Sequence, residues 1–279
     1  MNTSKHDFDP EGLARRHFDA MTSGSLDGTV IGWDESGSGT PVLLVHGGVG
    51  DSGVWSSVRA LLPDGLRVAA MDRRGRGRSG RGGDVHSLDV EADDVLSVAE
   101  ALGGGVVVVA HSIGATIALQ ALRRSDGLIR AAALYEPPLP GMGTGAPETF
   151  NQALDAGRDE DALTIFLSDM VRLSESEVAA FRASPMWQSR VALIWTMRRE
   201  GQSLDSHDQD LSRYGEIDVP IQLLVGTKTA PHHTEAILAL TTVIPNTETT
   251  VFEGQGHSAL VQAPELVAGA ITDLLRRID

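Results

Sequence analysis

Ala110-His111-Ser112-Ile113-Gly114 lies between an apolar run at residues 106–109 and an Ala-rich stretch with helical character. A serine on a sharp turn from a strand to a helix projects from the sheet, where a base can reach its hydroxyl group. Such a turn is strained and accepts only small residues two positions to either side of the serine, which Ala110 and Gly114 provide. Glycine is more usual where Ala110 stands, and an ordinary β–α turn can carry a serine by chance. We predict that Ser112 is a nucleophile.

The segments around this turn alternate between strand and helix patterns. Short runs rich in Val, Ile, Leu or Ala, without a period of two, are typical of strands buried on both faces of a parallel sheet. We expect an antiparallel edge strand at residues 28–34 before the sheet becomes parallel. The fold class predicted is α/β, with a mostly parallel central sheet covered by helices on both faces. The expected strands are 41–45, 66–71, 106–110, 129–134, 221–225 and 247–253, and the expected helices are 87–102, 115–124 and 264–277.

One long segment interrupts this alternation. Residues 139–215 carry helix signals but no strand run. Ser174 and Glu177 have the spacing of a capping box, and Gly201 is expected to end a helix. We predict a helical lid, or cap, at residues 139–215. It is inserted into an α/β core formed by residues 1–138 and 216–279.

Composition restricts the partners. A chain of 279 residues with 41% hydrophobic content can bury a full core, and its net charge of −15 argues against nucleic acid or an anionic membrane as partner. The absence of cysteine excludes disulfides and thiolate metal sites. Residues 1–20 lack the apolar core of a secretory signal, and no segment approaches a membrane span. We expect a cytoplasmic protein acting on a small molecule, from a bacterium to judge by its preference for Arg over Lys. A homo-oligomer stays open.

Two glycine-rich segments follow the first predicted parallel strands. His46-Gly47-Gly48-Val49-Gly50 can point a backbone N–H group into a cavity, although a tight βα turn gives the same pattern. The segment 72–80 contains a literal G-x-G-x-x-G. A dinucleotide site is disfavoured there, because the next helix starts only near residue 87 and the third glycine should lie inside it. We expect the five arginines at 73, 74, 76, 78 and 81 to form a solvated or salt-bridged loop.

A single histidine follows the last predicted strand, within Gly254-Gln255-Gly256-His257-Ser258. Its pKa lies near working pH, which makes histidine the natural general base. A lone histidine is more often structural. Since His257 comes after Ser112 in the chain order serine, acid, histidine, we predict that it is the base.

Together these motifs resemble the α/β-hydrolase superfamily, from about residue 25 to the C-terminus. The resemblance is closest to lidded, cofactor-free serine hydrolases, which include esterases, lactonases, haloperoxidase-like enzymes and C–C bond hydrolases. It implies that the N–H groups of Gly48 and Ile113 form the oxyanion hole, and that neither cofactor nor metal is needed. Members with an aspartate nucleophile, the epoxide hydrolases and haloalkane dehalogenases, are disfavoured because Ser112 holds that position.

The third triad member departs from the commonest pattern. Many members carry an aspartate after the strand that follows the lid, and here Thr229 stands where that acid is expected. Another branch places the acid after the strand that follows the nucleophile helix. Glu136 ends the apolar run 129–134, followed by two prolines, and a carboxylate there points into the ligand crevice. We predict that Glu136 orients His257, with Glu235 as a distant second.

The remaining histidines and the large apolar residues are harder to place. We expect the pair His232-His233 to lie in a solvated loop rather than to bind a metal, His111 to pack locally and His46 to orient its own loop. The following large side chains could line an apolar pocket, although such residues on helices are more often core: Trp55, Phe166, Met186, Trp187, Trp195 and Met197.

The predicted activity is that of a serine hydrolase on a small, moderately apolar ester, lactone or related acyl compound, through an acyl-enzyme intermediate. A C–C bond hydrolase or an acyltransferase would use the same triad. A cofactor-free oxygenase would use His257 without acylation of Ser112. A non-catalytic small-molecule-binding module also stays open.

Overall fold

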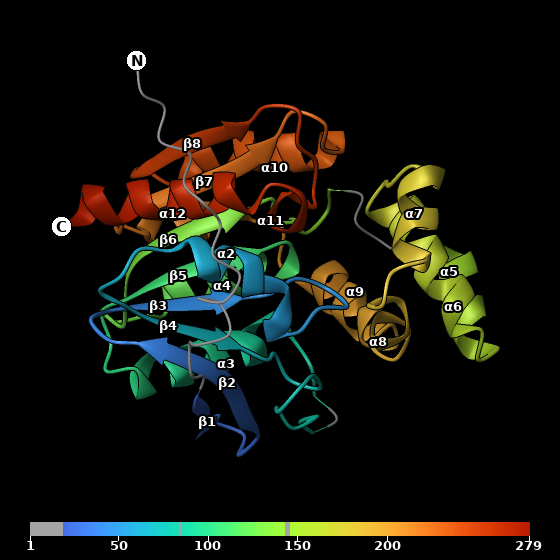
Figure 1. Ribbon diagram of the computed structural model, residues 1–279, viewed down its shortest axis with the longest axis horizontal. Helices are drawn as coiled ribbons and strands as arrows, with labels where there is room; N and C mark the ends of the chain where they lie inside the picture. Colours follow the sequence, from blue (N-terminus) through green and yellow to red (C-terminus); the bar gives the residue numbers. More distant parts are fainter. Residues whose placement is uncertain (1–18, 84, 143–145) are drawn as a thin grey trace, which may run out of the picture.

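The computed structural model describes residues 19–83, 85–142 and 146–279 (Figure 1). In this part of the chain eight strands form one sheet with the order β1-β2-β4-β3-β5-β6-β7-β8. All neighbours from β4 to β8 are parallel, whereas β2 is antiparallel to both β1 and β4. The strands are β1 (Asp19–Gly24), β2 (Val30–Gly37), β3 (Thr40–Val45), β4 (Leu66–Met71), β5 (Val106–His111), β6 (Ile129–Tyr135), β7 (Ile221–Gly226) and β8 (Thr247–Phe252).

This sheet confirms the predicted fold class, and each expected parallel strand lies within about a residue of its predicted bounds. The prediction of an edge strand at 28–34 is wrong in one respect. That segment overlaps β2, but β2 is not the edge strand. β1 pairs with the free side of β2 and forms the edge of the sheet. Five of the six residues of β1 are exposed, so no apolar pattern marks the strand in the sequence. The prediction that residues 1–20 contain no secretory signal concerns a segment that, apart from Asp19 and Ala20, lies outside the described residues.

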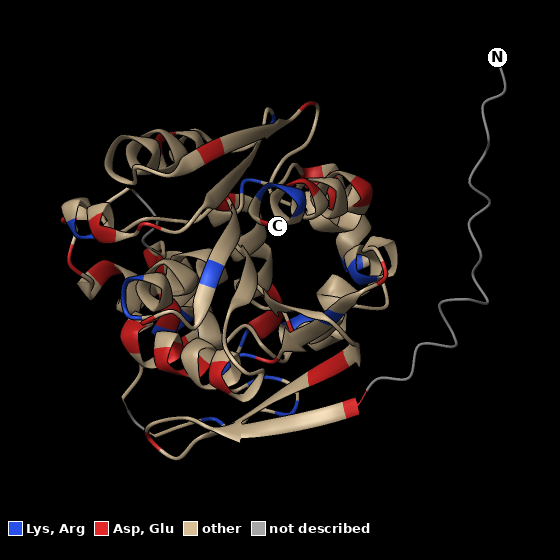
Figure 2. Cartoon of the chain, turned by 90° about the vertical axis from the view of Figure 1, so that its left-hand side faces the viewer, with Lys and Arg blue, Asp and Glu red and all other residues tan. Residues whose placement is uncertain are grey.

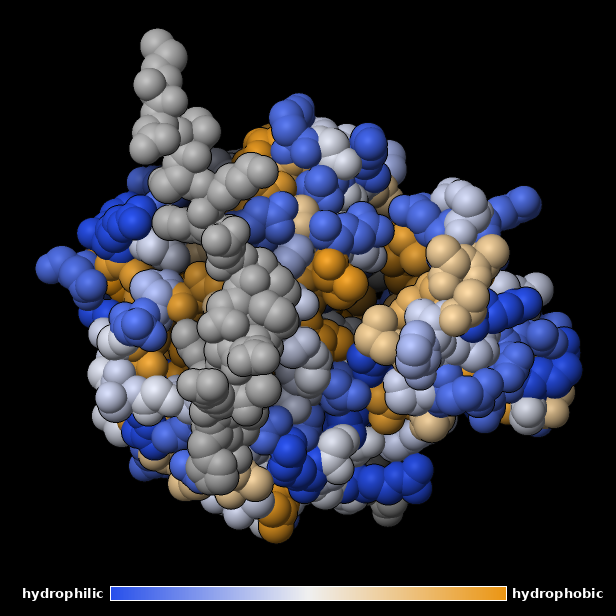
Figure 3. All heavy atoms as spheres, viewed as in Figure 1, coloured by the Kyte–Doolittle hydropathy of each residue, from blue (hydrophilic) through white to orange (hydrophobic). Residues whose placement is uncertain are grey.

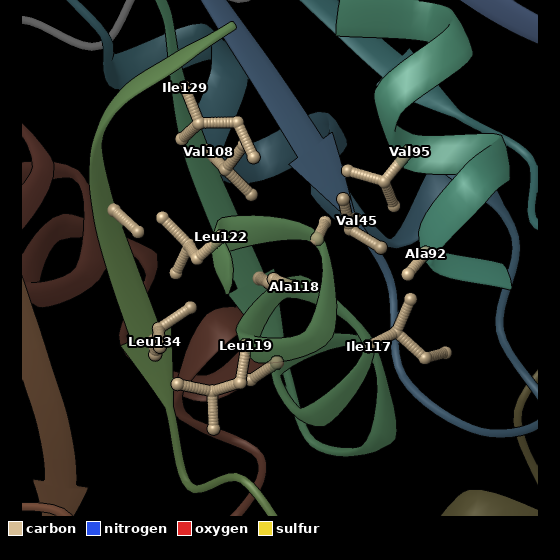
Figure 4. Packing of buried hydrophobic residues seen from close by; sticks show 14 of the residues in the cluster. Val45, Ala92, Val95, Val108, Ile117, Ala118, Leu119, Leu122, Ile129 and Leu134 are labelled. Carbon is tan, nitrogen blue, oxygen red and sulfur yellow. The ribbon is translucent and has the colours of Figure 1, made fainter. Parts of the chain in front are cut away.

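Helices cover both faces of the sheet because neighbouring residues of its central strands point in opposite directions. In β5, Val106 and Val108 face one hydrophobic cluster while Val107 and Val109 face another. The first cluster is closed by α3 (Leu88–Ala101), α4 (Ile113–Arg123) and α10 (Pro231–Val243). Figure 4 shows side chains of α4 and α3 meeting those of the sheet in this cluster. The opposite face is closed by α2 (Ser56–Leu61), α11 (Ala259–Gln262) and α12 (Pro264–Ile278).

The segment between β6 and β7 contains helices and no strand in its described part, and it projects from one end of the sheet (Figure 1). The capping box of Ser174 and Glu177 is present at the start of α7. The expected helix end at Gly201 is wrong, because α9 continues through it to Ser206. The division into a core and a separate lid stays a prediction. The elements of the insertion are α5 (Glu148–Asp155), α6 (Asp159–Ile165), the π-helix η2 (Phe166–Met170), α7 (Glu175–Arg182), α8 (Trp187–Val191), α9 (Thr196–Ser206) and the 3-10 helix η3 (Leu211–Glu216).

Of the two alternatives expected for the arginine-rich loop after β4, a solvated or a salt-bridged loop, the salt-bridged one is confirmed for Arg73, Arg74 and Arg76. Arg73 pairs with Glu91 of α3 (2.7 Å), and Arg74 pairs with Asp94 of the same helix (2.6 Å). Arg76 pairs with Glu200 of α9, and all three guanidinium groups are almost fully buried. Since Glu200 belongs to the insertion, this network attaches α9 to the core. Elsewhere acidic residues outnumber basic ones along the chain (Figure 2), in keeping with the net charge.

Within the described ranges, no helix combines the length and the apolar character that a bilayer crossing requires.

Gly114, in the first turn of α4, lies closer to β3 than any larger residue could. A Cβ atom built there would stand 2.4 Å from the carbonyl oxygen of His46 and 2.9 Å from that of Val45. Both obstacles are backbone atoms, which cannot rotate away. The contact sets the distance between the turn at Ser112 and the loop that follows β3.

We expect Gly114→Ala to lower the free energy of unfolding by about 1–3 kcal/mol, the usual cost of overpacking. Gly269→Ala in α12 is the matched control. A Cβ atom at Gly269 meets nothing within 4 Å, so the better helix propensity of alanine should be neutral or stabilising. Thermal and urea unfolding measure both. Equal stabilities for the two variants would contradict this account of the turn.

Candidate active site

Ser112 sits on the turn between β5 and α4 in a conformation that non-glycine residues rarely adopt. Its φ and ψ are 54° and −134°, and its amide donates to the carbonyl oxygen of Tyr135 at 2.9 Å. Backbone strain of this kind persists only where the surroundings hold it, and it concentrates at functional sites. The buried ends of β5 and β6 provide that support. The side chain of Ser112 consequently lines a cavity at the carboxyl edge of the sheet.

Glu136 directly follows β6 and is completely buried. Its Oε1 accepts the amide N–H of Gly226 (2.8 Å), and its Oε2 accepts the hydroxyl of Thr229 (2.9 Å). The same Oε2 lies 2.6 Å from Nδ1 of His257. A buried carboxylate is tolerable only when donors replace the water it has lost, and these three groups do so.

The contact with Glu136 assigns the tautomer of His257. An ionised carboxylate only accepts hydrogen bonds, so Nδ1 carries the proton and Nε2 keeps a free lone pair. Burial, helped by nearby His232, lowers the pKa of His257 below its ordinary value. The ring is therefore neutral near pH 7, as a general base must be. No hydrogen bond joins Ser112 Oγ to His257 in the described structure, although both side chains line the same cavity. Such contacts often tighten only when substrate binds.

The glycine loop after β3 is held by a buried histidine and an arginine. His46 Nε2 accepts the amide N–H of Arg73 (3.1 Å), so His46 Nδ1 carries a proton and donates it to the carbonyl oxygen of Gly47 (2.7 Å). The guanidinium group of Arg73 donates to the same oxygen (3.2 Å). With its carbonyl fixed, the loop places Gly48 on the cavity wall, where Ile113 also lies. His46 thus makes the contacts expected of a residue that orients its loop.

The cavity has an empty volume of about 740 Å³, including open solvent at its mouth. Figure 3 shows apolar atoms gathered in the hollow between the core and the inserted helices. Of the six side chains predicted to line a pocket, Phe166 and Met197 do so. The walls come from the core (Gly48, Ser112, Ile113, Pro138, His232, His233, His257) and from the insertion (Phe166, Asp169, Met170, Val171, Arg172, Met197, Glu200, Gly201, Leu204).

The other four predicted lining residues lie elsewhere. Trp55 belongs to the core cluster on the face of the sheet that α2, α11 and α12 cover. Trp187 packs edge-on against Phe181 inside the insertion. The ring of Trp195 is covered by the guanidinium groups of Arg81 and Arg199, at 4.3 and 4.8 Å. Met186 is 38% exposed. Large apolar side chains on helices bury against whatever faces them, and the sequence alone does not say whether that is a cavity or a core.

The expectation of a solvated loop at His232-His233 is wrong, since both residues are helical and His233 is buried. Both residues belong to the first turn of α10, and His233 is 4% exposed and lines the cavity. A signal was present in the sequence. Pro231 marks the first turn of a helix, and His233 then shares one face with Ala236, Ile237 and Leu240, at spacings of three, four and seven. That face is the one α10 buries.

Glu136, His233 and His257 bring their ligand atoms within 4.8 Å of one another. The rings of His233 and His257 are nearly parallel, with an interplanar angle of 10°. Imidazole lone pairs lie in the ring plane, so those of two stacked rings run side by side and do not converge on one ion. We assign no metal ion to this cluster.

The chain belongs to the alpha/beta hydrolase family, whose model matches residues 42–270. A non-heme haloperoxidase from Rhodococcus erythropolis is 29% identical over 249 residues, covering 83% of this chain and 90% of that protein. The bifunctional esterase/perhydrolase DCH of Acinetobacter calcoaceticus is 40% identical over 105 residues, covering 36% of this chain and 38% of that protein. An alpha/beta hydrolase from Sphaerobacter thermophilus superposes with a TM-score of 0.79 at 28% identity, covering 91% of this chain and all of that one.

These comparisons confirm the resemblance inferred from the motifs. The similar proteins include esterases and non-heme haloperoxidases, and they support a hydrolase activity for this chain. An esterase from Rhodococcus sp. ECU1013 has a TM-score of 0.76 but 22% identity, so its likeness concerns the fold alone.

The environment of His257 predicts how the reactivity of Ser112 depends on pH. Only the neutral imidazole can accept the serine proton, so reactivity is lost as pH falls through the pKa of His257 in the folded protein. Because burial lowers that pKa, the acid limb should have its midpoint below the ordinary value of 6.5. The rate of fluorophosphonate labelling, measured from pH 8 downwards for as long as circular dichroism shows a folded protein, gives this midpoint or an upper limit for it. A midpoint above 6.5 would mean that Glu136 outweighs the effect of burial.

Proposed function

We propose that the chain is a serine hydrolase in which Ser112 is the nucleophile, His257 the general base and Glu136 the residue that orients the base. The observation that carries the proposal is the 2.6 Å contact between Glu136 and His257 at the edge of the cavity that Ser112 lines. A buried carboxylate, a neutral imidazole and a strained serine at one site form the set that acyl transfer needs. The proposed substrate is a small ester, lactone or related acyl compound.

In the proposed reaction, Ser112 Oγ attacks the acyl carbon as Nε2 of His257 takes its proton. The negative charge that develops on the acyl oxygen is stabilised by the N–H groups of Gly48 and Ile113, with the N-terminal end of α4 behind them. Glu136 stabilises the imidazolium without taking its proton. His257 then protonates the leaving group, and a water molecule activated by the same nitrogen releases the acid from the acyl-enzyme.

The cavity walls favour a moderately apolar acyl compound. Phe166, Met170, Val171, Met197 and Leu204 face it from the insertion. Polar groups stand among them, including Arg172, the buried His233 and the half-buried His257, so the site is not uniformly apolar. A compact acyl group with one polar end suits these walls better than a long aliphatic chain.

The similar proteins favour a second candidate, perhydrolysis, since they include an esterase/perhydrolase and a non-heme haloperoxidase. Hydrogen peroxide would then replace water in attacking the acyl-enzyme, releasing a peracid and restoring the serine hydroxyl. Both candidates share the acylation step. Product analysis with and without peroxide separates them, and it would also reveal acyl transfer or C–C cleavage by the same residues.

Labelling by a fluorophosphonate and hydrolysis of p-nitrophenyl acetate test the nucleophile. The wild-type protein should label and turn over, and Ser112→Ala should lose both, because no other hydroxyl occupies the strained turn. A folded wild-type protein that does not label, or a Ser112→Ala variant that still does, would rule out Ser112 as nucleophile. The oxygenase and small-molecule-binding alternatives would then be tested by ligand-induced thermal shifts.

Glu136→Gln tests the acid. The amide can present its NH₂ group to Nδ1 of His257 and favour the wrong tautomer, so we expect kcat to fall about 10²- to 10⁴-fold. Glu235→Gln is the matched control, because Glu235 is exposed on α10 and is the less favoured acid. It should keep the wild-type rate. A large loss with Glu235→Gln and none with Glu136→Gln would reverse the assignment.

A further inference from the structure

Four histidines gather around the candidate active site, from three separate parts of the chain. The ring of His257 lies 4.6 Å from that of His111 and 4.4 Å from that of His233, measured between centroids. His232 continues the series, 4.1 Å from His233. The triad needs only His257. The others therefore require a separate explanation, and His233 has the most regular geometry, with its ring stacked on that of His257 at an angle of 10°.

His233 makes no polar contact that would explain its burial. The residue is 4% exposed, and its buried Nδ1 has no hydrogen-bond partner in the described structure. Leaving a buried polar atom unpaired costs free energy, which an apolar residue of similar size would avoid. What the ring does contact is the face of His257. Its position in the first turn of α10, a 13-residue helix packed on the sheet, makes it a rigid surface.

His257, in contrast, lies on a loop between β8 and α11, with glycines at positions 254 and 256. Gly254 has a φ of 74°, a conformation few other residues adopt. The loop is fixed at several points: the Tyr135 hydroxyl donates to the carbonyl oxygen of Gly256, and His111 Nε2 donates to that of His257 (2.9 Å). These bonds hold the backbone. At the ring itself, the bond from Nδ1 to Glu136 is the only hydrogen bond made within the described part of the chain.

One hydrogen bond at Nδ1 fixes one point of the imidazole ring and leaves its plane free to swing. Such a swing would move Nε2, at the far side of the ring, away from Ser112. A second ring stacked in parallel on the first opposes that motion across the whole face. We propose that His233 is a positioning residue for His257, whose stacked ring holds the imidazole plane so that Nε2 stays directed at the Ser112 hydroxyl. This inference rests on the proposed serine hydrolase function.

The charges around the pair are compatible with this role. Burial lowers the pKa of His233 to about 2, so its ring is neutral in the working range and does not repel the imidazolium that forms on His257. Besides each other, the two rings face Glu136 and Tyr135 from β6 and its end, His111 from β5, and His232 from α10. Arg172 and Glu235 are charged neighbours of His232 and do not face the pair directly.

The test compares His233→Ala, which removes the stacked ring, with His233→Phe, which keeps a flat ring and discards both nitrogens. For p-nitrophenyl acetate we expect His233→Ala to lower kcat about 10- to 100-fold with little change in KM, since a misplaced base slows chemistry more than binding. His233→Phe should recover kcat to within about threefold of wild type. Loss of the ring also admits water to His257, so the acid limb of the kcat profile should move to higher pH in His233→Ala only.

Circular dichroism and thermal unfolding establish that each variant is folded. A kcat and acid limb in His233→Ala equal to those of wild type would overturn the proposal. So would a His233→Phe variant as slow as His233→Ala, because the nitrogens rather than the stacked ring would then be required. Leu238→Ala, at a position of the same helix that is 62% exposed, controls for unspecific effects of changing α10.

A measurement without turnover keeps this inference separate from the proposed function. Nitrogen NMR of His257 in the Ser112→Ala protein reports the tautomer and the pKa of the ring. Adding His233→Ala to that protein should raise the pKa of His257 and broaden its signals, whereas adding His233→Phe should broaden them less. If the wild-type protein fails to label with a fluorophosphonate but the ring responds in this way, the proposed function is wrong and the stacking role holds. Unchanged signals in the alanine variant would refute the stacking role.

Discussion

The buried carboxylate of Glu136 is the constraint on which the rest of the site depends. It follows β6 and accepts hydrogen bonds from Gly226 at the end of β7, from Thr229 beyond it, and from His257 after β8. A charge without solvent is tolerated only if its donors remain in place, so each of these segments must end where it does. The imidazole of His257 is thereby attached to the sheet through Glu136. A change in the length of β6, β7 or β8 would disturb the same three contacts.

Backbone strain accumulates around this charge. Five non-glycine residues of the described chain have a positive φ, and all but Asp126 lie at or beside the cavity: Val49, Ser112, Glu136 and Arg172. Ser112 and Glu136 occupy equivalent places, one residue past the ends of adjacent parallel strands. Strain at such points is offset by the surrounding core, where alternate residues of β5 and β6 are buried on both faces of the sheet. The packing of the sheet thus offsets the free-energy cost of the positive φ angles at Ser112 and Glu136.

The sequence predicts those features of this arrangement that depend on neighbouring residues, and it does not predict those that depend on residues distant in the chain. Strands β3 to β7 can be located because burial on both faces requires continuous apolar runs, and Ser112 and Glu136 because each stands within two residues of the end of such a run. β8 is largely polar and exposed, and His257 is located by its glycine-rich loop and by its place after Ser112 in the chain. β1 could not be located, since an exposed edge strand needs no apolar residues. Trp55 and Trp195 were misplaced for a related reason. Whether a large side chain faces a cavity, a core or a pair of arginines depends on elements distant in sequence. The sequence leaves the arginine loop as either solvated or salt-bridged, because the acidic partners lie in α3 and α9.

The position of the acid also bears on the residues of α10. The carboxylate is supplied by Glu136, directly after β6. The position after β7 where many family members carry an aspartate holds Thr229, whose hydroxyl donates a hydrogen bond to Glu136. The chain then enters α10 at once through Pro231, and the first turn of that helix brings two imidazoles to the cavity wall. An aspartate in place of Thr229 would put a second charge beside Glu136, and like charges at that distance cannot both stay ionised without cost. The segment between β7 and α10 therefore carries no carboxylate that would have to be kept hydrated. His232 and His233 can consequently pack beside His257, because the carboxylate that contacts His257 comes from Glu136 after β6.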